Sequence, residues 1–599
     1  MTCGGGDSGR LDPDAQESEP SLRQPRARVA ESGSRGTERA CDSRWSAAST
    51  GANRTGGQSV APREPKAPPL AQGCDLRPWS TVHSPETGAG RLYAAAVAGH
   101  TPDALAPGLM VCGTSSNAGK TTVVAGLCRL LARRGLRVAP FKAQNMALNS
   151  AVTSSGHEIG RAQFAQAQAA GVPATVDMNP VLLKPTSDRD AQVIVAGRPI
   201  GAMSAAAYHE YKPELFELVL ASLQRLRDTF DVVIAEGAGS PAEINLAADD
   251  IVNLRVAERA GISAVLVGDI DLGGVFAALA GTVALLPTAQ RDLVRGFVIN
   301  KFRGDPALLG DGLDELERHC GVPTLGVIPM LDDLHLPDED SVALAENWRP
   351  HDTAQPDATA RLDVAVIAFP RLSNFTDFDP LVKEPDVTLR LVRSVRELGR
   401  PDLILLGGSK STVADLAWMR ERGLAGAVQE AASEHGAVVL GICGGYQMMG
   451  SSIADEVESA AGVVAALDLL AVETVFEHDK VLAQRHGEAL GADVEGYQIH
   501  HGRVRPCLEG AAEPWLWLDG EPDGFCDGPI MGTSLHGVFD SDAFRHAFLA
   551  HVAEIRGCDF VPARGSFAER RDQQFDRVAD ALEEHLDLGT LFEIVGLGA

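Results

Sequence analysis

The stretch Gly113-Thr-Ser-Ser-Asn-Ala-Gly-Lys-Thr-Thr122 decides the fold of the first half of the chain. It follows the apolar run 109–112, which predicts a buried strand, and precedes apolar residues at helical spacing from Val123 to Leu131. A glycine-bounded loop between a strand and a helix turns backbone N–H groups towards an anion, and the helix N-terminus adds partial positive charge. Five residues separate the two glycines, one more than in the commonest loop of this kind. The stretch predicts a phosphate-binding loop and therefore a nucleotide site.

Side chains in and after this loop carry the chemistry that a nucleotide site needs. Lys120 would reach the terminal phosphates, and the Thr121 hydroxyl would bind magnesium. Ligands of open α/β sheets collect at the carboxyl ends of the strands. Glu236 follows an apolar run, and a carboxylate there could hold magnesium against the phosphates. Other polar residues follow strands in the same way and could equally be capping or turn residues: Lys142, Gln144, Asn145, Asp269, Asp271, Asn300 and Lys301.

Apolar strands alternate with helical stretches along most of the chain. In the first half we expect strands at 109–112, 136–141, 231–235, 263–268, 296–300 and 324–328, with helices at 158–170, 205–227 and 251–260. Such alternation implies right-handed crossovers and a parallel sheet with helices on both faces. A second alternating unit has strands expected at 362–368, 388–392, 402–406, 437–442 and 530–534. The sequence therefore predicts an α/β fold with two doubly wound parallel-sheet domains.

These patterns divide the chain into five expected segments. Residues 1–105 are rich in Gly, Ser, Arg, Pro and Glu, and a segment with so few apolar residues cannot offset its ordering entropy, so we expect a disordered extension. The nucleotide-binding domain follows at 106–345, and a linker at 346–361. The second domain spans 362–549. A C-terminal tail at 550–599 carries a helical pattern from Glu569 to His585.

Composition limits the classes of partner. The chain has 599 residues, of which 45% are hydrophobic and 22% charged, as in soluble globular proteins. Its net charge of −28 argues against general binding of nucleic acid or of anionic membranes, and no apolar stretch is long enough for a membrane span. The ten cysteines form no Cys-x-x-Cys pair, which favours a reducing cytoplasm. We therefore expect small-molecule substrates; the oligomeric state stays open.

The second domain contains a candidate nucleophile. Residues 436–450 read as a strand, a sharp turn with Cys443 at its apex, and a helix. Glycines at 441, 444 and 445 permit the strained backbone of such a turn, and the helix N-terminus behind the sulfur favours thiolate over thiol. Backbone N–H groups at Gly444 and in the Gly407-Gly408 loop could form an oxyanion hole. The pattern indicates nucleophilic catalysis.

A thiol nucleophile needs a base, and the residues alone leave three candidates. His536 lies just beyond an apolar strand near the end of the second domain. His500 and His501 follow a predicted strand at 496–499. Their spacing does not decide between them.

Several further stretches carry a family resemblance. From about residue 107 to 590 the chain resembles the cobyric acid synthases, glutamine-dependent amidases of cobalamin biosynthesis. The resemblance rests on the phosphate-binding loop, the cysteine turn and five motifs: Phe141-Lys-Ala-Gln-Asn-Met-Ala-Leu-Asn-Ser150, Met178-Asn-Pro-Val-Leu-Leu-Lys-Pro185, Glu236-Gly-Ala-Gly-Ser-Pro-Ala-Glu-Ile-Asn-Leu246, Asn374-Phe-Thr-Asp-Phe-Asp-Pro-Leu381 and Gly496-Tyr-Gln-Ile-His-His-Gly502.

The resemblance implies a synthetase domain related to dethiobiotin synthetase, followed by a class I glutamine amidotransferase domain. Glutamine would supply ammonia, which passes internally to the first domain. ATP would activate a corrinoid carboxylate as an acyl phosphate, and ammonia would displace the phosphate. The family repeats this on the b, d, e and g carboxylates of adenosylcobyrinic acid a,c-diamide, with ATP and Mg²⁺ required.

The resemblance also assigns roles to residues. Cys443 would be the nucleophile and His536 its base, with Gly408, Gly444 and Gln447 holding glutamine or the oxyanion. Thr121 and Glu236 would bind magnesium. The nucleotide would contact Gly113, Thr114, Asn117, Gly119, Lys120, Thr121, Thr122, Lys142 and Asn300, the last of these at the adenine. The stretches Met178–Pro185 and Pro241–Asn245 are candidate corrinoid contacts.

The chain departs from the family pattern in a few places. Most class I amidotransferases have glutamate two residues after the histidine, where this chain has Val538. Amidotransferases of this branch lack that glutamate, so the third member of the site is absent or supplied elsewhere. Gly407 stands where proline is expected, Leu272 where arginine is usual, and Gln498 where glutamate is expected.

Three other interpretations remain. Cobyrinic acid a,c-diamide synthase shares both domains and amidates other carboxylates, but the motifs after Phe141 and Asn374 argue against it. A nucleotide-switched binding protein would have no use for Cys443 beside Gln447. An inactive paralogue would have lost Lys120, Glu236, Cys443 or His536, and all four are present.

Overall fold

The structure is a computed structural model that describes residues 105–336, 361–508, 510 and 512–598. All of these residues belong to one compact unit of the chain, residues 72–599. The expected disordered extension and the linker fall almost entirely outside the described residues. Both remain predictions, as do the domain boundaries.

The first sheet has six strands, and every neighbouring pair is parallel. Their order across the sheet is β12 (Thr324–Pro329), β11 (Val294–Phe302), β10 (Ser263–Asp269), β1 (Gly108–Gly113), β9 (Val232–Glu236) and β2 (Val138–Phe141). All six match strands expected from the sequence. Because β1 lies between β9 and β10, the loop that follows it meets the carboxyl ends of both neighbours.

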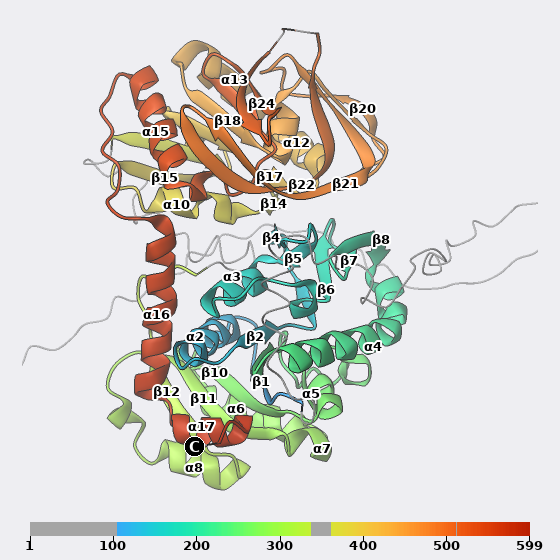
Figure 1. Ribbon diagram of the computed structural model, residues 1–599, viewed down its shortest axis with the longest axis vertical. Coiled ribbons are helices and arrows are strands. Elements are labelled where there is room, and N and C mark those ends of the chain that lie inside the picture. Colours follow the sequence, from blue (N-terminus) through green and yellow to red (C-terminus); the bar gives the residue numbers. More distant parts are fainter. Residues whose placement is uncertain (1–104, 337–360, 509, 511, 599) are drawn as a thin grey trace, which may run out of the picture. The chain divides into compact units, whose positions relative to one another are not determined.

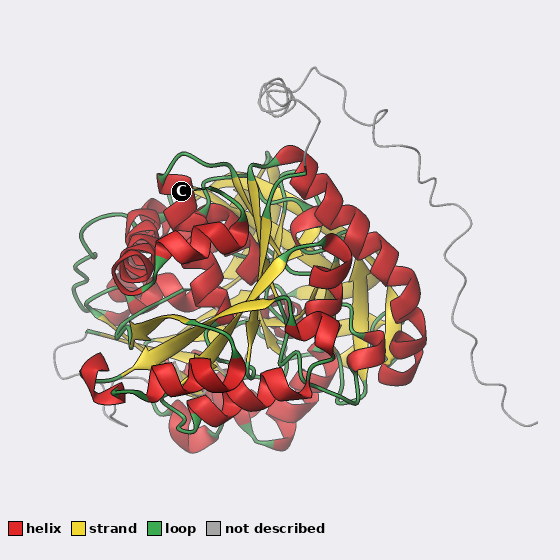
Figure 2. Cartoon of the chain, turned by 90° about the horizontal axis from the view of Figure 1, so that it is seen from below, coloured by secondary structure: helices red, strands yellow, loops and turns green. Residues whose placement is uncertain are grey.

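Helices cover both faces of this sheet (Figures 1 and 2). One face packs against α4 (Ala205–Thr229), α5 (Leu254–Ala260) and α6 (Val275–Leu285), and the other against α2 (Lys120–Arg133), α16 (Phe567–His585) and α17 (Leu588–Val595). Shorter elements connect the strands: α3 (Arg161–Ala169), η2 (Val176–Met178), η3 (Ala247–Asp249), α7 (Thr288–Arg291), η4 (Pro306–Leu309) and α8 (Gly312–Cys320).

An insertion between β2 and α4 was not predicted. It contains a four-stranded sheet of β3 (Gln144–Met146), β6 (Val181–Pro185), β7 (Asp190–Val195) and β8 (Arg198–Ser204), and a hairpin of β4 (Ser150–Val152) and β5 (Glu158–Gly160). The helix expected at 158–170 therefore begins three residues late, because Glu158–Gly160 pairs with Ser150–Val152 instead. Strands of three residues carry too little periodicity to be read from the sequence.

The second sheet begins as predicted with five parallel strands. They are β15 (Val387–Val392), β13 (Leu362–Ile367), β16 (Leu403–Leu406), β18 (Val438–Ile442) and β25 (Ile530–Thr533). Beyond β25 the sheet continues through strands that are mostly antiparallel and were largely unpredicted: β24 (Glu521–Asp527), β23 (Glu513–Leu518), β21 (Val472–Ala489), β22 (Ala492–Pro506), β19 (Ser452–Asp455) and β20 (Gly462–Ala465).

Helices and short turns surround the parallel part of the second sheet (Figure 1). Two short strands, β14 (Leu372–Ser373) and β17 (Gly408–Ser409), also pair with each other beside the carboxyl ends of the parallel strands. The helices and turns are η5 (Phe375–Phe378), α10 (Asp379–Val382), α11 (Val395–Leu398), α12 (Thr412–Glu421), α13 (Leu424–His435), α14 (Gly444–Met449), η6 (Val538–Asp540) and α15 (Asp542–Arg556).

The C-terminal segment returns to the first sheet. Helix α16 packs against α2, where Arg129 makes two hydrogen bonds to Asp576, and the Asp587 N–H donates to Leu325 O of β12. The expected helix at 569–585 is confirmed, and α17 adds a helix that was not predicted. None of the described helices combines the length and the hydropathy that crossing a bilayer requires.

Candidate active sites

The predicted phosphate-binding loop connects β1 to α2 at the carboxyl end of the first sheet. Two of its residues have positive φ, Asn117 at 58° and Gly119 at 94°. A Cβ atom at Gly119 would lie 2.0 Å from Asn300 Nδ2, so only glycine fits there. Asn300 Nδ2 donates to Ala118 O at 3.0 Å, which ties the end of β11 to the loop. The structure thus brings Asn300 to the loop, and its contact with adenine remains a prediction.

Lys120 lies folded over the loop. Its Nζ donates to Ser115 O at 2.8 Å and to Gly239 O at 3.2 Å, so the ammonium sits between the loop and the segment after β9. A Cβ atom at Gly113 would lie 2.9 Å from Nζ, which explains a glycine at that end of the loop. The Thr114 N–H donates to Val267 O of β10, and Thr122 lies in the first turn of α2.

Glu236 is the centre of a buried network beside the loop. Its Oε1 accepts from Thr121 Oγ1 at 2.8 Å and from Lys142 Nζ at 2.9 Å, and its Oε2 accepts from Gln166 Nε2 at 2.7 Å. Burial alone would raise the pKa of Glu236, but the charge of Lys142 and these hydrogen bonds hold it below its usual range. The carboxylate therefore stays charged beside the Thr121 hydroxyl, and these two oxygens are of the type that magnesium prefers.

Two more of the predicted residues meet on the other side of the loop. Lys301 Nζ contacts both Asp269 Oδ2 and Asn117 O at 2.7 Å, so it links β10 and β11 to the loop backbone. Asp269 Oδ1 accepts the Asp271 N–H. Asp269 and Lys301 therefore shape the loop. This agrees with the capping or turn role that the sequence left open for Asp269.

The turn at Cys443 joins β18 to α14, as predicted. Its backbone is strained, with φ 50° and ψ −107°. A Cβ atom at Gly445 would lie 1.9 Å from Leu406 O, and one at Gly444 would lie 2.6 Å from Ser409 N, so both glycines are required by the close approach of β16 and β17. Cys443 is the N-cap residue of α14, and its Sγ lies 3.7 Å from Ile499 O. The geometry is that of a nucleophile turn whose cysteine, though 7% exposed, lines the pocket.

His536 is the histidine that faces this cysteine. Its Nδ1 lies 2.7 Å from Asp377 Oδ2, its ring stacks on Tyr497 at 5.5 Å between centroids, and its side chain also interacts with that of Cys443. Burial alone would lower the pKa of His536, but the charges of Asp377 and Cys443 and the hydrogen bonds to them raise it to about 10. His536 is therefore protonated at neutral pH, beside Cys443.

His500 and His501 line the same pocket, but neither is hydrogen-bonded to Cys443 among the described contacts, so the geometry favours His536 as the base. Their Nδ1 atoms contact the carbonyls of Gly502 at 2.7 Å and Glu477 at 3.0 Å, and because a carbonyl only accepts, each Nδ1 carries the proton. Burial lowers the pKa of His500 to about 3 and also lowers that of His501, so both rings are neutral at pH 7. Each Nε2 is therefore an acceptor, and neither has a hydrogen-bond partner among the described residues.

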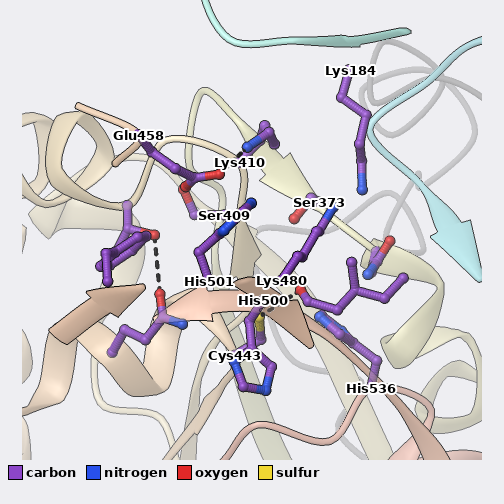
Figure 3. A pocket seen from close by; sticks show the side chains of 15 residues that line it. Lys184, Ser373, Ser409, Lys410, Cys443, Glu458, Lys480, His500, His501 and His536 are labelled. Carbon is purple, nitrogen blue, oxygen red and sulfur yellow. Dashed lines mark hydrogen bonds and ion pairs between the residues drawn. The ribbon is translucent and has the colours of Figure 1, made fainter. Parts of the chain in front are cut away.

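These side chains line one pocket (Figure 3). Around Cys443 it gathers Gln447, the three histidines and the lysines Lys184, Lys410 and Lys480. The carboxamide of Gln447 lies between Thr412 Oγ1 at 3.4 Å and Gly502 O at 3.5 Å. A Cβ atom at Gly408 would lie 2.9 Å from His536 Cε1, so this glycine lies directly beside the histidine. The predicted Cys443, His536, Gly408, Gly444 and Gln447 thus come together.

Lys184, from the first half of the chain, forms one wall of the pocket. Glu158 of β5 accepts from Lys184 of β6 at 2.7 Å and from Lys480 of β21 at 2.6 Å. All three side chains are less than a tenth exposed. Two lysines on one carboxylate leave net positive charge beside Cys443, although the whole chain is strongly acidic.

Sequence reasoning missed several of these residues. Asp377 lies in the quoted motif Asn374–Leu381, which was given no role. Gln166 lies in α3, where a helix was expected, and Glu158 lies in β5, which was expected to be helix. Val538 is fully buried in an apolar core and supplies nothing to the site. Of the candidate corrinoid contacts, Met178–Leu183 are mainly buried, whereas Ile244 in Pro241–Asn245 is 68% exposed.

Comparison with known proteins agrees with both sites. Residues 109–342 match the CobQ/CobB/MinD/ParA nucleotide binding domain, and residues 363–544 match the CobB/CobQ-like glutamine amidotransferase domain. Cobyric acid synthases of Streptomyces avermitilis and Rhodococcus jostii are 51% and 50% identical to the chain; each alignment covers 82% of the chain, with 97% and 96% of the relative. That of Klebsiella pneumoniae (strain 342) is 46% identical over 81% of the chain and 98% of the relative. The chain belongs to the cobyric acid synthase family.

Proposed function

We propose that the chain uses glutamine and ATP to amidate the b, d, e and g carboxylates of adenosylcobyrinic acid a,c-diamide, giving adenosylcobyric acid. The observation that carries the proposal is the pocket around Cys443, which combines a nucleophile, a charged histidine and a wall from the nucleotide-binding half. A glutaminase without synthesis would not need that wall. The curated relatives, all named cobyric acid synthases, support the choice of corrinoid substrate.

In the second domain, the Cys443 thiolate attacks the side-chain carbonyl of glutamine. Backbone N–H groups of Gly444 and of the Gly408 loop lie where they can stabilise the oxyanion. His536 donates a proton to the departing nitrogen, and ammonia leaves as the C–N bond breaks. His536 then takes a proton from water, which attacks the thioester, breaks the C–S bond and releases glutamate.

In the first domain, a corrinoid carboxylate attacks the γ-phosphorus of ATP, and ADP leaves. Lys120 and the loop N–H groups hold the phosphates and offset the charge on the transferred group. Ammonia then attacks the acyl phosphate and expels inorganic phosphate. Thr121 and Glu236 have the oxygens to hold Mg²⁺, which supplies charge neutralisation at the phosphates when bound. Each turnover converts one OH of a carboxyl group to NH₂.

Mass spectrometry of the corrinoid tests the proposal. Adenosylcobyrinic acid a,c-diamide incubated with ATP, magnesium and glutamine should gain up to four amides. The Cys443→Ala variant should do so only with free ammonium, whereas the control Cys526→Ala, a half-buried cysteine of β24, should behave as wild type. No mass change with wild type would reject the synthase, and cobyrinic acid itself would then be tried as substrate. A Cys443→Ala variant still active on glutamine would remove Cys443 from its role.

A further inference from the structure

Both carboxylate oxygens of Asp377 accept hydrogen bonds from the His536-Gly537 dipeptide. Oδ2 lies 2.7 Å from His536 Nδ1, and Oδ1 accepts the backbone N–H of Gly537 at 2.9 Å. Asp377 and His536 are each only 1% exposed. One carboxylate therefore fixes both the ring and the backbone of the same residue pair.

This contact determines which nitrogen of His536 faces the thiol. A carboxylate accepts, so Nδ1 carries a proton, and Nε2 is left as the proton-exchanging atom towards Cys443. A carboxylate in this position also stabilises the imidazolium that forms when the thiol is ionised. A buried carboxylate without a cation is costly, so the pair favours charge on His536 from its side as well. Val538, at the position where glutamate is usual, can do none of this.

The turn that carries Asp377 is held by the nucleotide-binding half of the chain. Asn374, at φ 53° before η5, accepts the Ser150 N–H on its Oδ1 at 2.9 Å. In return Asn149 Oδ1 accepts the Phe375 N–H at 3.2 Å. Both asparagines are buried, and they exchange hydrogen bonds across more than two hundred residues of chain. We call this exchange the asparagine clamp. It lies three residues before Asp377.

From these contacts we propose that Asp377 is the third member of the glutaminase site, a positioning residue that orients His536, and that the asparagine clamp lets the synthetase domain hold it in place. The glutaminase is then complete only when the two domains are docked. This inference rests on the proposed function, because it needs Cys443 to be the nucleophile.

The pKa of His536 depends on the titratable and charged groups that surround its ring. They are Asp377 from η5, Cys443 from the turn before α14, and Tyr497 and His500 from β22, with Arg161 from α3 and Asp540 from η6 behind them. Asp377 is the carboxylate in direct contact with the ring. Its removal should therefore lower the pKa of His536 and bring the alkaline limit of glutaminase activity to lower pH.

The test compares Asp377→Asn with wild type in three assays on the full chain. We expect glutamine-dependent amidation to fall about 100-fold in kcat, the scale of a lost acid–base function, while ammonium-dependent amidation stays within threefold. The alkaline limb of the pH profile should move to lower pH. Alkylation of Cys443 by iodoacetamide should need higher pH, since the thiolate loses part of its counter-charge. Asp377→Glu should restore part of the activity.

The matched control is Asp402→Asn. Asp402 also accepts a backbone N–H with one oxygen, from Asp363 at 2.9 Å, and a cationic side chain with the other, from Arg556 at 2.9 Å. It immediately precedes β16, at the amino ends of the parallel strands, whereas Cys443 follows the carboxyl end of β18, so Asp402→Asn should leave all three assays unchanged. Wild-type glutamine activity and an unmoved pH profile in Asp377→Asn would overturn the proposal. If wild type itself gave no amidation, the proposed function would fall; if wild type amidated and Cys443→Ala lost its glutamine-dependent activity, only this inference would fall.

Asn149→Ala tests the clamp from the other domain and covers a failure of Asp377→Asn to fold. The variant keeps every side chain of the glutaminase site, yet we expect glutamine-dependent amidation to fall at least fivefold with the same shift of the alkaline limb. Ammonium-dependent amidation should change less than the glutamine-dependent reaction. Equal losses with both nitrogen donors and an unmoved pH limb would show a structural effect alone and would overturn the clamp.

Discussion

The two sites differ in which sheets of the molecule support them. Around the phosphate-binding loop, the partners Glu236, Lys142 and Asn300 all come from strand ends of the same parallel sheet. Around Cys443, the histidine is aligned by Asp377 of the second sheet's own domain, and the pocket is also lined by Lys184 of the other half, which Glu158 holds. The first site is built by one sheet, and the second depends on contacts between two.

This difference teaches where communication between the two reactions can lie. A site supported by its own sheet keeps its geometry when its neighbour moves, whereas a site whose wall and orienting acid are shared does not. The nucleotide-binding half therefore has physical contacts through which to influence glutamine hydrolysis. The predictions below test the two sites separately, and then the contacts that support each of them.

The largest effect is expected at Lys120. Lys120→Met removes the cation that lies over the loop, and loss of such a charge from a phosphoryl-transfer site costs about 1000-fold. Amidation should fall by that factor with glutamine and with ammonium alike, whereas Cys443→Ala spares ammonium. Alkylation of Cys443 by iodoacetamide should be unchanged, because the second site does not rely on the loop.

Lys301→Met is the matched control for this lysine. Lys301 also donates to the loop backbone, at Asn117 O, but it does so from the outer side through a partly exposed side chain. Amidation should then fall less than tenfold. If Lys120→Met retained more than a tenth of ammonium-dependent activity, the assignment of this loop to the transferred phosphates would be wrong.

The next effect is expected from breaking the Lys142–Glu236 pair. Its side chains are 3% and 1% exposed, and removing one partner of such a pair leaves a buried charge uncompensated, at a cost of about 4 kcal/mol. Glu236→Gln should therefore lower the first urea-unfolding transition strongly. The double variant with Lys142→Met should recover most of that loss. Similar losses of stability in the single and double variants would show that the unpaired charge of Lys142 does not cause the loss.

The sequence predicted the first site better than the second because the first is built from the strand ends of one sheet. The loop, Lys120, Thr121 and Glu236 follow strands in a local pattern, and parallel strands carry such residues to one edge. Cys443 was also local, as a strand–turn–helix. Among the histidines, however, only a family resemblance selected His536, because its partner Asp377 arrives through tertiary packing that no spacing reveals. The segment before α3 was read as helix, so Glu158 was missed.

A somewhat smaller effect is expected at the shared wall of the pocket. Glu158→Gln leaves Lys184 and Lys480 without their carboxylate, but Lys184 keeps a 2.7 Å hydrogen bond to Ser150 Oγ, so we expect a loss of about 3 kcal/mol. Burial would raise the pKa of Glu158, yet the two lysines hold it well below its usual range.

The sign of that shift gives a pH dependence. A carboxyl whose pKa is lower in the folded state stabilises the fold above its unfolded pKa of about 4.5, and this stabilisation is lost as pH falls further. The gap between wild type and Glu158→Gln should therefore be full at pH 7 and shrink below pH 4.5, as measured by urea unfolding at both pH values. A gap that is constant with pH would mean that the carboxylate is not charged in the native protein.

The smallest effect is expected where α16 supports the helix of the phosphate-binding loop. Gly126 lies in the middle of α2, and a Cβ atom there would lie 2.5 Å from Val578 Cγ1 and 2.7 Å from Leu582 Cδ1 of α16. Gly126→Ala gains about 1 kcal/mol of helix propensity but overpacks this contact at a cost of about 2 kcal/mol. We therefore expect a net loss of about 1 kcal/mol in urea unfolding.

Two variants separate these opposing terms. Gly281→Ala lies inside α6, where a Cβ atom would meet nothing within 4 Å, so the propensity term alone should stabilise the protein by up to about 1 kcal/mol. Val578→Ala removes the nearest methyl group but leaves Leu582, so in that background Gly126→Ala should destabilise less. An unchanged loss in the double variant would mean that α16 does not press on α2. The phosphate site would then depend on its own sheet even more completely than the comparison with the glutamine site suggests.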